Sequence, residues 1–327
     1  ASKDIVDRLL NNEQTTRIPT CYVEYDKRNR GVPEKGVMIL TATTSGGKST
    51  VAMNLAAYWY LKQNKSVCRI SLEMDDLQES RRLASHLTQI PFNKFKSGKL
   101  SSMDRQKLRR TMEEFSAHGA EHGINYTSIS PEKGVSIDEA FALVAPFGYN
   151  IIMIDYIGLL TGMDAQSQWF QLSEVAAAAK RFSSAHNCLV VILAQLDDTT
   201  DKLRYSKGIK EHADTMWQWN YTKPEQRELH ILPVRCEKDR DGEVFNFELA
   251  ERFDVMTAEN LAESAGSAYD TDDDNYGPSQ EKPRKKKKAK FEEAEDDDAP
   301  TTKKKGKKKR KRLDDEDPSE PATYALA

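Results

Sequence analysis

Residues Ala42–Thr50 read A-T-T-S-G-G-K-S-T and stand between a short apolar run, Val37–Thr41, and the start of a helical pattern. A turn of small residues between a buried strand and a helix directs its backbone N–H groups, and those of the helix N-terminus, toward one point where a phosphate is held. The stretch matches the P-loop pattern G-x-x-x-x-G-K-[ST] except at its first position, where Ala42 replaces glycine. It predicts an α/β fold that binds a nucleotide.

Two side chains of this stretch have distinct expected roles. Lys48 would bridge the β- and γ-phosphates of ATP, and the Ser49 hydroxyl would bind Mg²⁺. A glycine-rich turn with an incidental lysine is the alternative interpretation, but the strand before and the helix after argue against it. The residues expected to contact the nucleotide are Ser45, Gly46, Gly47, Lys48, Ser49 and Thr50.

Polar residues also end three other apolar runs. Asp155 directly follows Ile151–Ile154, and a carboxylate there is the expected second ligand of Mg²⁺. Glu73 ends another run and suits a general base for the attacking water. Gln195 ends a third, where an uncharged amide would sense the γ-phosphate. Any one of these alone is equally well a solvated strand end, but together they predict a complete hydrolysis site.

The order of the apolar runs predicts the architecture. They are nearly continuous rather than alternating, which is typical of strands buried on both faces of a parallel sheet. Helical patterns alternate with them, so we expect βαβ units in a mainly parallel, doubly wound sheet. The predicted strands are Val37–Thr41, Val67–Leu72, Ile151–Ile154, Leu189–Ala194 and Leu229–Val234. The predicted helices are Thr50–Asn64, Leu77–Gln89, Ser102–His118, Ile137–Ala145 and Trp169–Ala185.

The chain of 327 residues divides by composition. Residues 1–17 predict a short extension with a polar helix at Lys3–Leu10, and residues 18–256 predict the folded body. Residues 257–327 are almost free of large apolar side chains and alternate acidic with basic blocks, such as Glu292–Asp298 and Lys303–Arg312. Such a segment buries too little apolar surface to offset the entropy of ordering it, so a disordered tail is predicted.

The four cysteines favour no disulfide or zinc site. They are scattered, without C-x-x-C spacing, and Cys68 and Cys188 fall within apolar runs typical of core residues. No apolar run approaches the roughly 20 residues that span a bilayer. We therefore expect a reducing, cytoplasmic setting and no membrane partner.

With these residues in place, the chain resembles the DnaB-type hexameric replicative helicases, including their bacteriophage members. Ser71-Leu72-Glu73-Met74 resembles the family's S-L-E-M motif, which carries the proposed catalytic glutamate, and Ile154-Asp155-Tyr156 resembles its Walker B motif I-D-Y. Ala194-Gln195-Leu196 is similar to its S-Q-L sensor. Many members also lack the first glycine of the P-loop. The resemblance spans most of residues 18–256 and implies a RecA-like ATPase domain.

The resemblance also implies a mechanism: six such domains form a ring that moves 5′ to 3′ on single-stranded DNA. Each subunit would supply an arginine finger to its neighbour's nucleotide. The family carries this arginine, with a nearby lysine, after the last strands in a K-x-R-x-G pattern, which Lys238 and Arg240 fit. Two alternatives stay open: Arg235 as the finger, and a solvated charged hairpin around Asp241-Gly242.

A DNA-binding loop is implied by the stretch L-R-x-S…A-D, which Leu203–Ser206 and Ala213-Asp214 resemble. Basic side chains and backbone N–H groups there would hold the DNA backbone, with 162–168 as a weaker second segment. The candidates are Lys202, Arg204, Lys207, Gly208 and Lys210. The family's large N-terminal domain is not evident before residue 18, which suits a minimal phage-like version, a fragment or a relative with another role.

Two further questions stay open. The tail would tether DNA or a partner such as a primase, a polymerase or a helicase loader, or would only solvate the chain. The ATPase would drive a helicase, or else a RecA-like recombinase or recombination mediator that assembles on single strands without unwinding. A small-molecule P-loop kinase would need an arginine-rich lid, which the sequence does not suggest.

Overall fold

The computed structural model describes residues 16–161, 168–196, 206–221 and 224–261. All of them fall in the first of the two units into which the chain divides, Ala1–Asp270. The predicted helix Lys3–Leu10 and the predicted tail beyond residue 261 lie outside these ranges. Within them, no helix combines the length and apolarity that crossing a bilayer requires.

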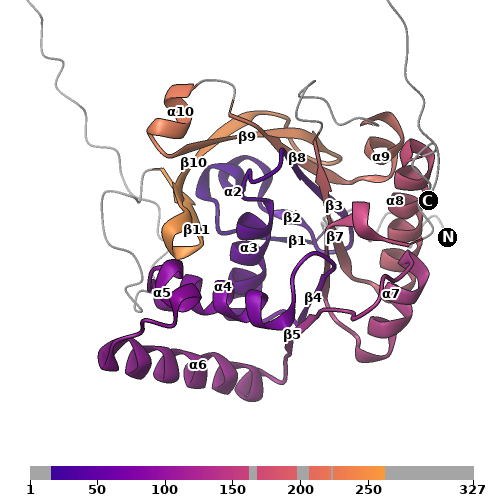
Figure 1. Ribbon diagram of the computed structural model, residues 1–327. Coiled ribbons are helices and arrows are strands. Elements are labelled where there is room, and N and C mark those ends of the chain that lie inside the picture. Colours follow the sequence, from indigo (N-terminus) through magenta and orange to yellow (C-terminus); the bar gives the residue numbers. More distant parts are fainter. Residues whose placement is uncertain (1–15, 162–167, 197–205, 222–223, 262–327) are drawn as a thin grey trace, which may run out of the picture. The chain divides into compact units, whose positions relative to one another are not determined.

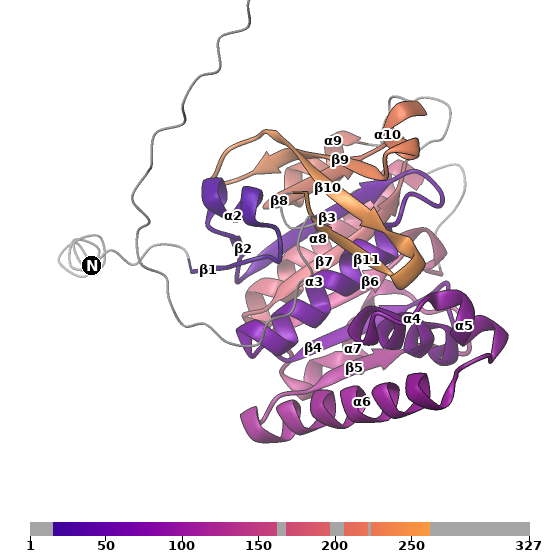
Figure 2. The same cartoon turned by 90° about the vertical axis from the view of Figure 1, so that its left-hand side faces the viewer.

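A nine-stranded sheet organises the described residues, with the order β11-β10-β9-β8-β3-β7-β6-β4-β5 (Figures 1 and 2). The run from β8 to β5 is parallel, whereas β9, β10 and β11 are antiparallel. Its strands are β3 (Gly36–Ala42), β4 (Val67–Ser71), β5 (Tyr126–Ile129), β6 (Ile151–Asp155), β7 (Leu189–Gln195), β8 (Thr215–Trp219), β9 (Ile231–Asp239), β10 (Asn246–Arg252) and β11 (Thr257–Asn260). A separate two-stranded sheet pairs β1 (Arg17–Ile18) with β2 (Val32–Pro33).

Helices cover both faces of this sheet (Figure 1), which confirms the predicted mainly parallel α/β fold. One face packs against α3 and α2, and the other against α7, α8 and α9. The helices are α2 (Val23–Asn29), α3 (Lys48–Gln63), α4 (Asp76–Thr88), α5 (Phe92–Ser97), α6 (Ser102–His122), α7 (Ile137–Val144), α8 (Gln168–His186), α9 (Ser206–His212) and α10 (Pro224–Glu228), with 3-10 turns η1 (Ala145–Phe147), η2 (Ile157–Leu159) and η3 (Phe253–Val255).

Strand β3 shows why the sheet is buried on both faces. Met38 and Leu40 face the core under α3, and Val37 and Ile39 face the core under α8. Every residue of β3 is buried, as a continuous apolar run predicts. The side-chain alternation of a strand therefore fixes its orientation between two helical layers.

The antiparallel edge differs most from the expectation based on sequence. The predicted strand Leu229–Val234 begins two residues later, at Ile231, and continues to Asp239. Two further strands follow, so the K-x-R-x-G pattern lies in the β9–β10 turn and not after the last strands. Buried and exposed residues alternate in β10, and such a strand shows no continuous apolar run. Strand β11 carries the sheet four residues past the predicted boundary at residue 256.

Candidate nucleotide site

The P-loop links β3 to α3 at the carboxyl edge of the sheet. The Gly46 N–H donates to the Thr43 carbonyl at 3.1 Å and closes the turn. Helix α3 starts at Lys48 and has no side-chain cap, because its N-cap residue is Gly47. The first N–H groups of a helix have no partner within the helix, so an anion is the natural acceptor for them.

Space and backbone conformation explain the two glycines. Gly47 has φ 78°, and a Cβ there would stand 2.2 Å from the ring of Phe253. A Cβ on Gly46 would lie 3.0 Å from the Thr43 carbonyl oxygen. Ala42, by contrast, is the last residue of β3, where a methyl group is accommodated in ordinary strand geometry. The missing first glycine of the pattern therefore leaves the turn intact.

Lys48 lies folded over the loop. Its Nζ donates to the carbonyls of Ala42 at 3.0 Å and Thr43 at 2.9 Å. Trp219, at the end of β8, donates its indole N–H to the Gly46 carbonyl at 2.6 Å and braces the turn from the neighbouring strand. The ammonium group thus lies within the loop whose N–H groups would face a phosphate.

The other predicted nucleotide contacts take different positions. Ser45 is exposed with φ 57°, and Ser49 is half-buried in the first turn of α3. Thr50 is buried, and its hydroxyl donates to the Met256 sulfur at 4.0 Å. Ser45 and Ser49 are therefore open to a ligand, whereas Thr50 already contacts the segment after η3.

Asp155 fits a metal ligand by its lack of partners. It ends β6, level with Ser71 at the end of β4, and is only 3% exposed. Neither carboxylate oxygen has a hydrogen-bond partner among the described residues, and the nearest cation, Arg69, is 3.8 Å away and pairs more closely with Glu79 at 2.7 Å. A buried carboxylate without hydrogen bonds is costly unless it binds something. The chemistry of Asp155 and Ser49, two oxygen donors, suits Mg²⁺.

Glu73 and Gln195 border the same edge. Glu73 is exposed two residues after β4 ends, and the pKa of the Tyr156 hydroxyl is raised first by burial and then by the charges of Glu73 and Asp155. Both carboxylates therefore lie near one ring. The Gln195 side chain is exposed and donates to the Thr44 hydroxyl at 2.5 Å. The three predicted strand-end residues and the P-loop are thus brought to one edge.

Lys238 and Arg240 lie at the opposite edge of the sheet. The Arg240 N–H donates to the Asp214 carbonyl, and its Nε pairs with Asp214 Oδ1 at 2.9 Å. Asp214 Oδ2 accepts from the N–H of Val37, near the start of β3. The P-loop follows the end of β3, so at about 3.3 Å per residue roughly 17 Å of strand separate the two sites. Within one chain, Arg240 does not reach the P-loop.

Lys238 is held beside Arg240. Its ammonium group donates to the carbonyls of Lys210 and, at 3.5 Å, of Glu211. Partial burial, and then the charge of Arg240, lower the pKa of Lys238. Arg235, the alternative finger, lies further back along β9 and pairs with Glu237 at 2.9 Å.

Most of the predicted DNA contacts lie outside the described residues. Lys202 and Arg204 fall in the undescribed stretch 197–205, and the weaker segment 162–168 is undescribed up to residue 167. Lys207 and Gly208 lie in α9, where only the backbone is described. Lys210 pairs with Glu237 at 2.8 Å.

Three residues that touch the P-loop were not predicted from the sequence. Trp219 braces Gly46, the ring of Phe253 covers Gly47, and Asn220 lies 3.3 Å from the Thr43 hydroxyl oxygen. They end or follow β8 and β10, strands without a continuous apolar run. The W-x-W pattern of Trp217 and Trp219 is a signal that could have indicated a buried strand here.

Comparisons with known proteins agree with this arrangement. Residues 17–259 match the family described as DnaB-like helicase C terminal domain. The replicative DNA helicase DnaB of Geobacillus stearothermophilus is 26% identical over 265 residues, which cover 76% of this chain and 57% of that protein. The replicative DNA helicase DnaC of Bacillus subtilis (strain 168) is 27% identical over 267 residues, with the same coverage. The chain thus spans little more than half the length of these relatives.

Solved structures share the fold. The ATPase domain of a phage protein superposes with a TM-score of 0.69 at 23% identity, covering 80% of this chain and 98% of that one. A DnaB-like replicative helicase, described with its interactions with primase, gives a TM-score of 0.66 at 22% identity and covers 80% and 66%. Since the family matches about three quarters of the chain, from Arg17 to Glu259, the protein belongs to the DnaB-like helicase C terminal domain family.

Proposed function

We propose that this protein is the motor part of an ATP-dependent replicative DNA helicase, in which six copies form a ring on single-stranded DNA. One observation carries the proposal: the P-loop and the K-x-R pair lie at opposite edges of the sheet, so one chain holds both halves of an ATPase site that it cannot join. A head-to-tail ring joins them at each interface.

The carboxyl edge would hold the nucleotide. The N–H groups of the loop and of the start of α3 would bind the phosphates, and Lys48 would exchange its two carbonyl partners for phosphate oxygens. Ser49 and Asp155 would hold Mg²⁺, which neutralises charge on the phosphates when bound. The carboxylate oxygens of Asp155, without partners among the described residues, support this role.

Glu73 would orient and deprotonate the attacking water. It is exposed at the edge, so water reaches it freely, and it lies near the buried Asp155 without being buried itself. Gln195 would report the state of the γ-phosphate to the loop, because its amide already contacts Thr44. A hydrogen bond there that changes on hydrolysis would move the start of the DNA-facing segment that follows β7.

Lys238 and Arg240 would act on the neighbouring subunit's nucleotide. Both are fixed against the α9–β8 connection by backbone and side-chain bonds, and the Arg240 side chain is half exposed. A guanidinium held in that way stabilises charge on the transferring phosphoryl group without reorganising. Arg235 is the weaker candidate, since it lies within β9 and not at its end.

DNA would run past the segment between β7 and β8. We assign the contacts to Lys202, Arg204, Lys207, Gly208 and Lys210, with 5′ to 3′ movement as the family resemblance implies. Lys210 would exchange Glu237 for a phosphate. A primase, which one of the similar helicases is described as contacting, and a loader or polymerase are the partners proposed for the tail.

A strand-displacement assay tests the function. With a 5′ single-stranded overhang, the protein should unwind a duplex in the presence of ATP and Mg²⁺, and single-stranded DNA should stimulate its ATPase. A 3′ overhang is the matched control for polarity. ATP-dependent filaments that pair strands without unwinding would favour a recombinase, and an ATPase indifferent to DNA would contradict both.

A further inference from the structure

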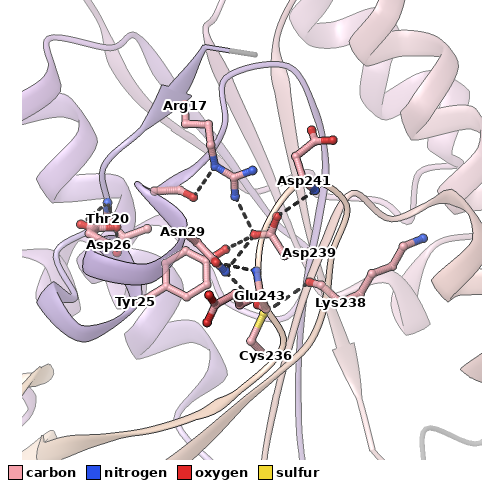
Figure 3. A network of polar contacts seen from close by, with 11 residues as sticks. Arg17, Thr20, Tyr25, Asp26, Asn29, Cys236, Lys238, Asp239, Asp241 and Glu243 are labelled. Carbon is pink, nitrogen blue, oxygen red and sulfur yellow. Dashed lines mark hydrogen bonds and ion pairs between the residues drawn. The ribbon is translucent and has the colours of Figure 1, made fainter. Parts of the chain in front are cut away.

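A carboxylate with no exposure lies between the two residues of the proposed trans pair. Asp239 separates Lys238 from Arg240, and its side chain is 0% exposed. Its Oδ2 accepts from the Tyr25 hydroxyl at 2.5 Å, from Arg17 Nη2 at 2.6 Å and from Asn29 Nδ2 at 3.2 Å (Figure 3). All three donors come from the N-terminal β1–α2 unit, more than two hundred residues away along the chain.

Such burial exceeds what a surface turn requires. A charged residue in a β-turn is ordinarily solvated, and removing a carboxylate from water is costly unless several donors meet it. Here an arginine, a buried tyrosine and an amide converge on one oxygen, and the Asp241 N–H reaches the other oxygen at 3.3 Å. The tyrosine hydroxyl has its pKa raised by burial and then by the Asp239 charge, so it stays a donor. Four groups therefore serve to fix one side chain.

Side-chain alternation transmits that anchor to the trans pair. Neighbouring residues at the end of a strand point to opposite sides. Asp239 points to α2, whereas Lys238 and Arg240 contact the α9–β8 connection through Lys210 and Asp214. Figure 3 shows the Lys238 side chain leaving the network on the far side. Holding Asp239 in place therefore fixes the rotation of the strand end that carries both cations.

The turn that follows is fixed by the same unit. Asn29 donates to the Glu243 carbonyl at 3.0 Å and accepts from the Glu243 N–H at 2.7 Å, as a strand neighbour would. A Cβ on Gly242 would lie 2.6 Å from Asn29 Oδ1 and 2.8 Å from Asp239 Oδ1. The glycine of the K-x-R-x-G pattern is thus needed here for the close approach of this anchor.

We infer that Asp239, Arg17, Tyr25 and Asn29 form a positioning network for Lys238 and Arg240, through which the N-terminal β1–α2 unit sets how the pair meets the neighbour's nucleotide. This inference rests on the proposed function, since it needs the trans pair to exist. None of the four residues touches the nucleotide. Their loss should lower kcat in assembled rings while leaving ATP binding unchanged.

The variants are Tyr25→Phe, Asp239→Asn and Gly242→Ala, with Tyr60→Phe as the matched control. Tyr25→Phe removes one hydroxyl and keeps the ring packed on Trp217 and Phe245. Tyr60→Phe removes another buried hydroxyl, bonded to the Phe115 carbonyl between α3 and α6. Because a misplacement of about 1 Å can cost about 10²-fold in rate, we expect Asp239→Asn and Gly242→Ala to lose roughly that much kcat and Tyr25→Phe roughly fivefold. The KM for ATP should stay within about twofold for every variant, and Tyr60→Phe should keep its kcat.

Mixed rings separate positioning from simple misfolding. Each variant is co-assembled in equal amount with Lys48→Ala, whose P-loop is disabled but whose trans pair is intact, and the basal ATPase is measured without DNA. Random mixing in a head-to-tail ring gives about a quarter of the interfaces an intact P-loop facing an intact pair, so activity should return toward that fraction. Arg240→Ala mixed with Lys48→Ala is the reference.

Each outcome has one meaning. If the reference mixture and the network variants both recover activity, the network positions the pair in trans. If the reference recovers and the network variants do not, or if their KM for ATP rises with the loss of kcat, the network serves only its own subunit's fold and the inference is wrong. If the reference itself recovers nothing, the trans pair of the proposed function is wrong.

Discussion

At the carboxyl end of β3, Asp155 is buried and neither of its carboxylate oxygens has a hydrogen bond among the described residues, whereas at the amino end Asp214 is equally buried and fully engaged. Asp214 accepts from the Val37 N–H at 2.8 Å, from Lys180 at 2.5 Å and from Arg240 at 2.9 Å. The two carboxylates have similar burial and opposite environments. One edge of the sheet is left incomplete, and the other is tied together.

The difference shows how a single fold holds two halves of a reaction. Polar groups without partners mark where a ligand supplies the missing contacts, and the P-loop edge, as far as the structure describes it, has such a group in Asp155 beside the exposed Glu73. Densely paired groups mark where a side chain must be held in one orientation, as Lys238 and Arg240 are. A receiving edge and a holding edge at opposite ends of one sheet complement each other between copies of the chain.

The largest expected effect comes from emptying the receiving edge of its cation. Lys48→Ala should lower ATP turnover by about 10⁴-fold or more, because the ammonium neutralises phosphate charge that the loop N–H groups alone do not. Turnover of ATP by phosphate release measures it. Lys62→Ala, an exposed lysine in the last turn of the same helix, is the control. Near-normal turnover in Lys48→Ala would remove the nucleotide site from this edge.

Removing the cation of the holding edge should come next. Arg240→Ala should cost about 10³-fold in ATPase, in the lower range for arginine fingers, and only in assembled rings. Asp214 keeps Lys180 and the Val37 N–H, so the fold should survive. Arg235→Ala on the same strand is the matched control and should change the rate by less than about threefold, since its exposed pair with Glu237 contributes little. If Arg235→Ala were the more damaging change, the finger would be Arg235.

The two edges also differ in how far the sequence predicts them. At the receiving edge each expected residue ends a continuous apolar run, so Glu73, Asp155 and Gln195 need only the strand to be recognised. At the holding edge the prediction depends on motif resemblance alone. Its strands β8 and β10 have alternating or tryptophan-rich patterns, and its anchors join residues far apart along the chain, such as Tyr25 with Asp239. Pairing at that separation leaves no local signal in the sequence.

Contacts that brace the P-loop escape prediction for the same reason. Phe253 and Met256 reach α3 only because β10 and β11 fold back over it. The predicted body ends at residue 256, where charged residues begin to outnumber apolar ones, and so it excludes β11. Short edge strands with two half-buried residues resemble tail sequence in composition.

A smaller effect should follow from the base at the receiving edge. Glu73→Gln keeps the size and hydrogen-bonding reach of the side chain but cannot accept the proton of water, so hydrolysis should fall by about 10³-fold with ATP binding intact. Single-turnover hydrolysis and binding of a fluorescent ATP analogue measure the two separately. Asp76→Asn, an exposed carboxylate three residues further on, is the control. Loss of binding in Glu73→Gln would give Glu73 a structural role and would weaken the contrast between the two edges.

The smallest expected effect concerns a tightly paired polar cluster behind the receiving edge. His86 is buried, and its Nδ1 lies 3.2 Å from Nδ2 of Asn54 on α3 and 3.0 Å from the Thr257 hydroxyl on β11. The Asn54 amide also donates to the Met256 carbonyl at 2.9 Å. An amide nitrogen only donates, so Nδ1 must accept, and the imidazole is neutral. Burial lowers the pKa of His86 from 6.5 to about 4.

The sign of the resulting pH dependence follows from these two values. As pH falls through 6.5 the unfolded chain takes up a proton at this histidine, while the folded chain does so only near pH 4. Its contribution is therefore fully present above pH 6.5 and is lost between 6.5 and 4, by about 3 kcal/mol in total. His86→Asn, whose Oδ1 can replace Nδ1 as the acceptor, should flatten denaturant-unfolding stability across that window by this amount. His122→Asn, at an exposed position of α6, controls for the loss of one histidine. An unchanged slope in His86→Asn would mean that the cluster opens at acid pH without unfolding, and the KM for ATP, which should not change in either variant, would then show whether α3 moves with it.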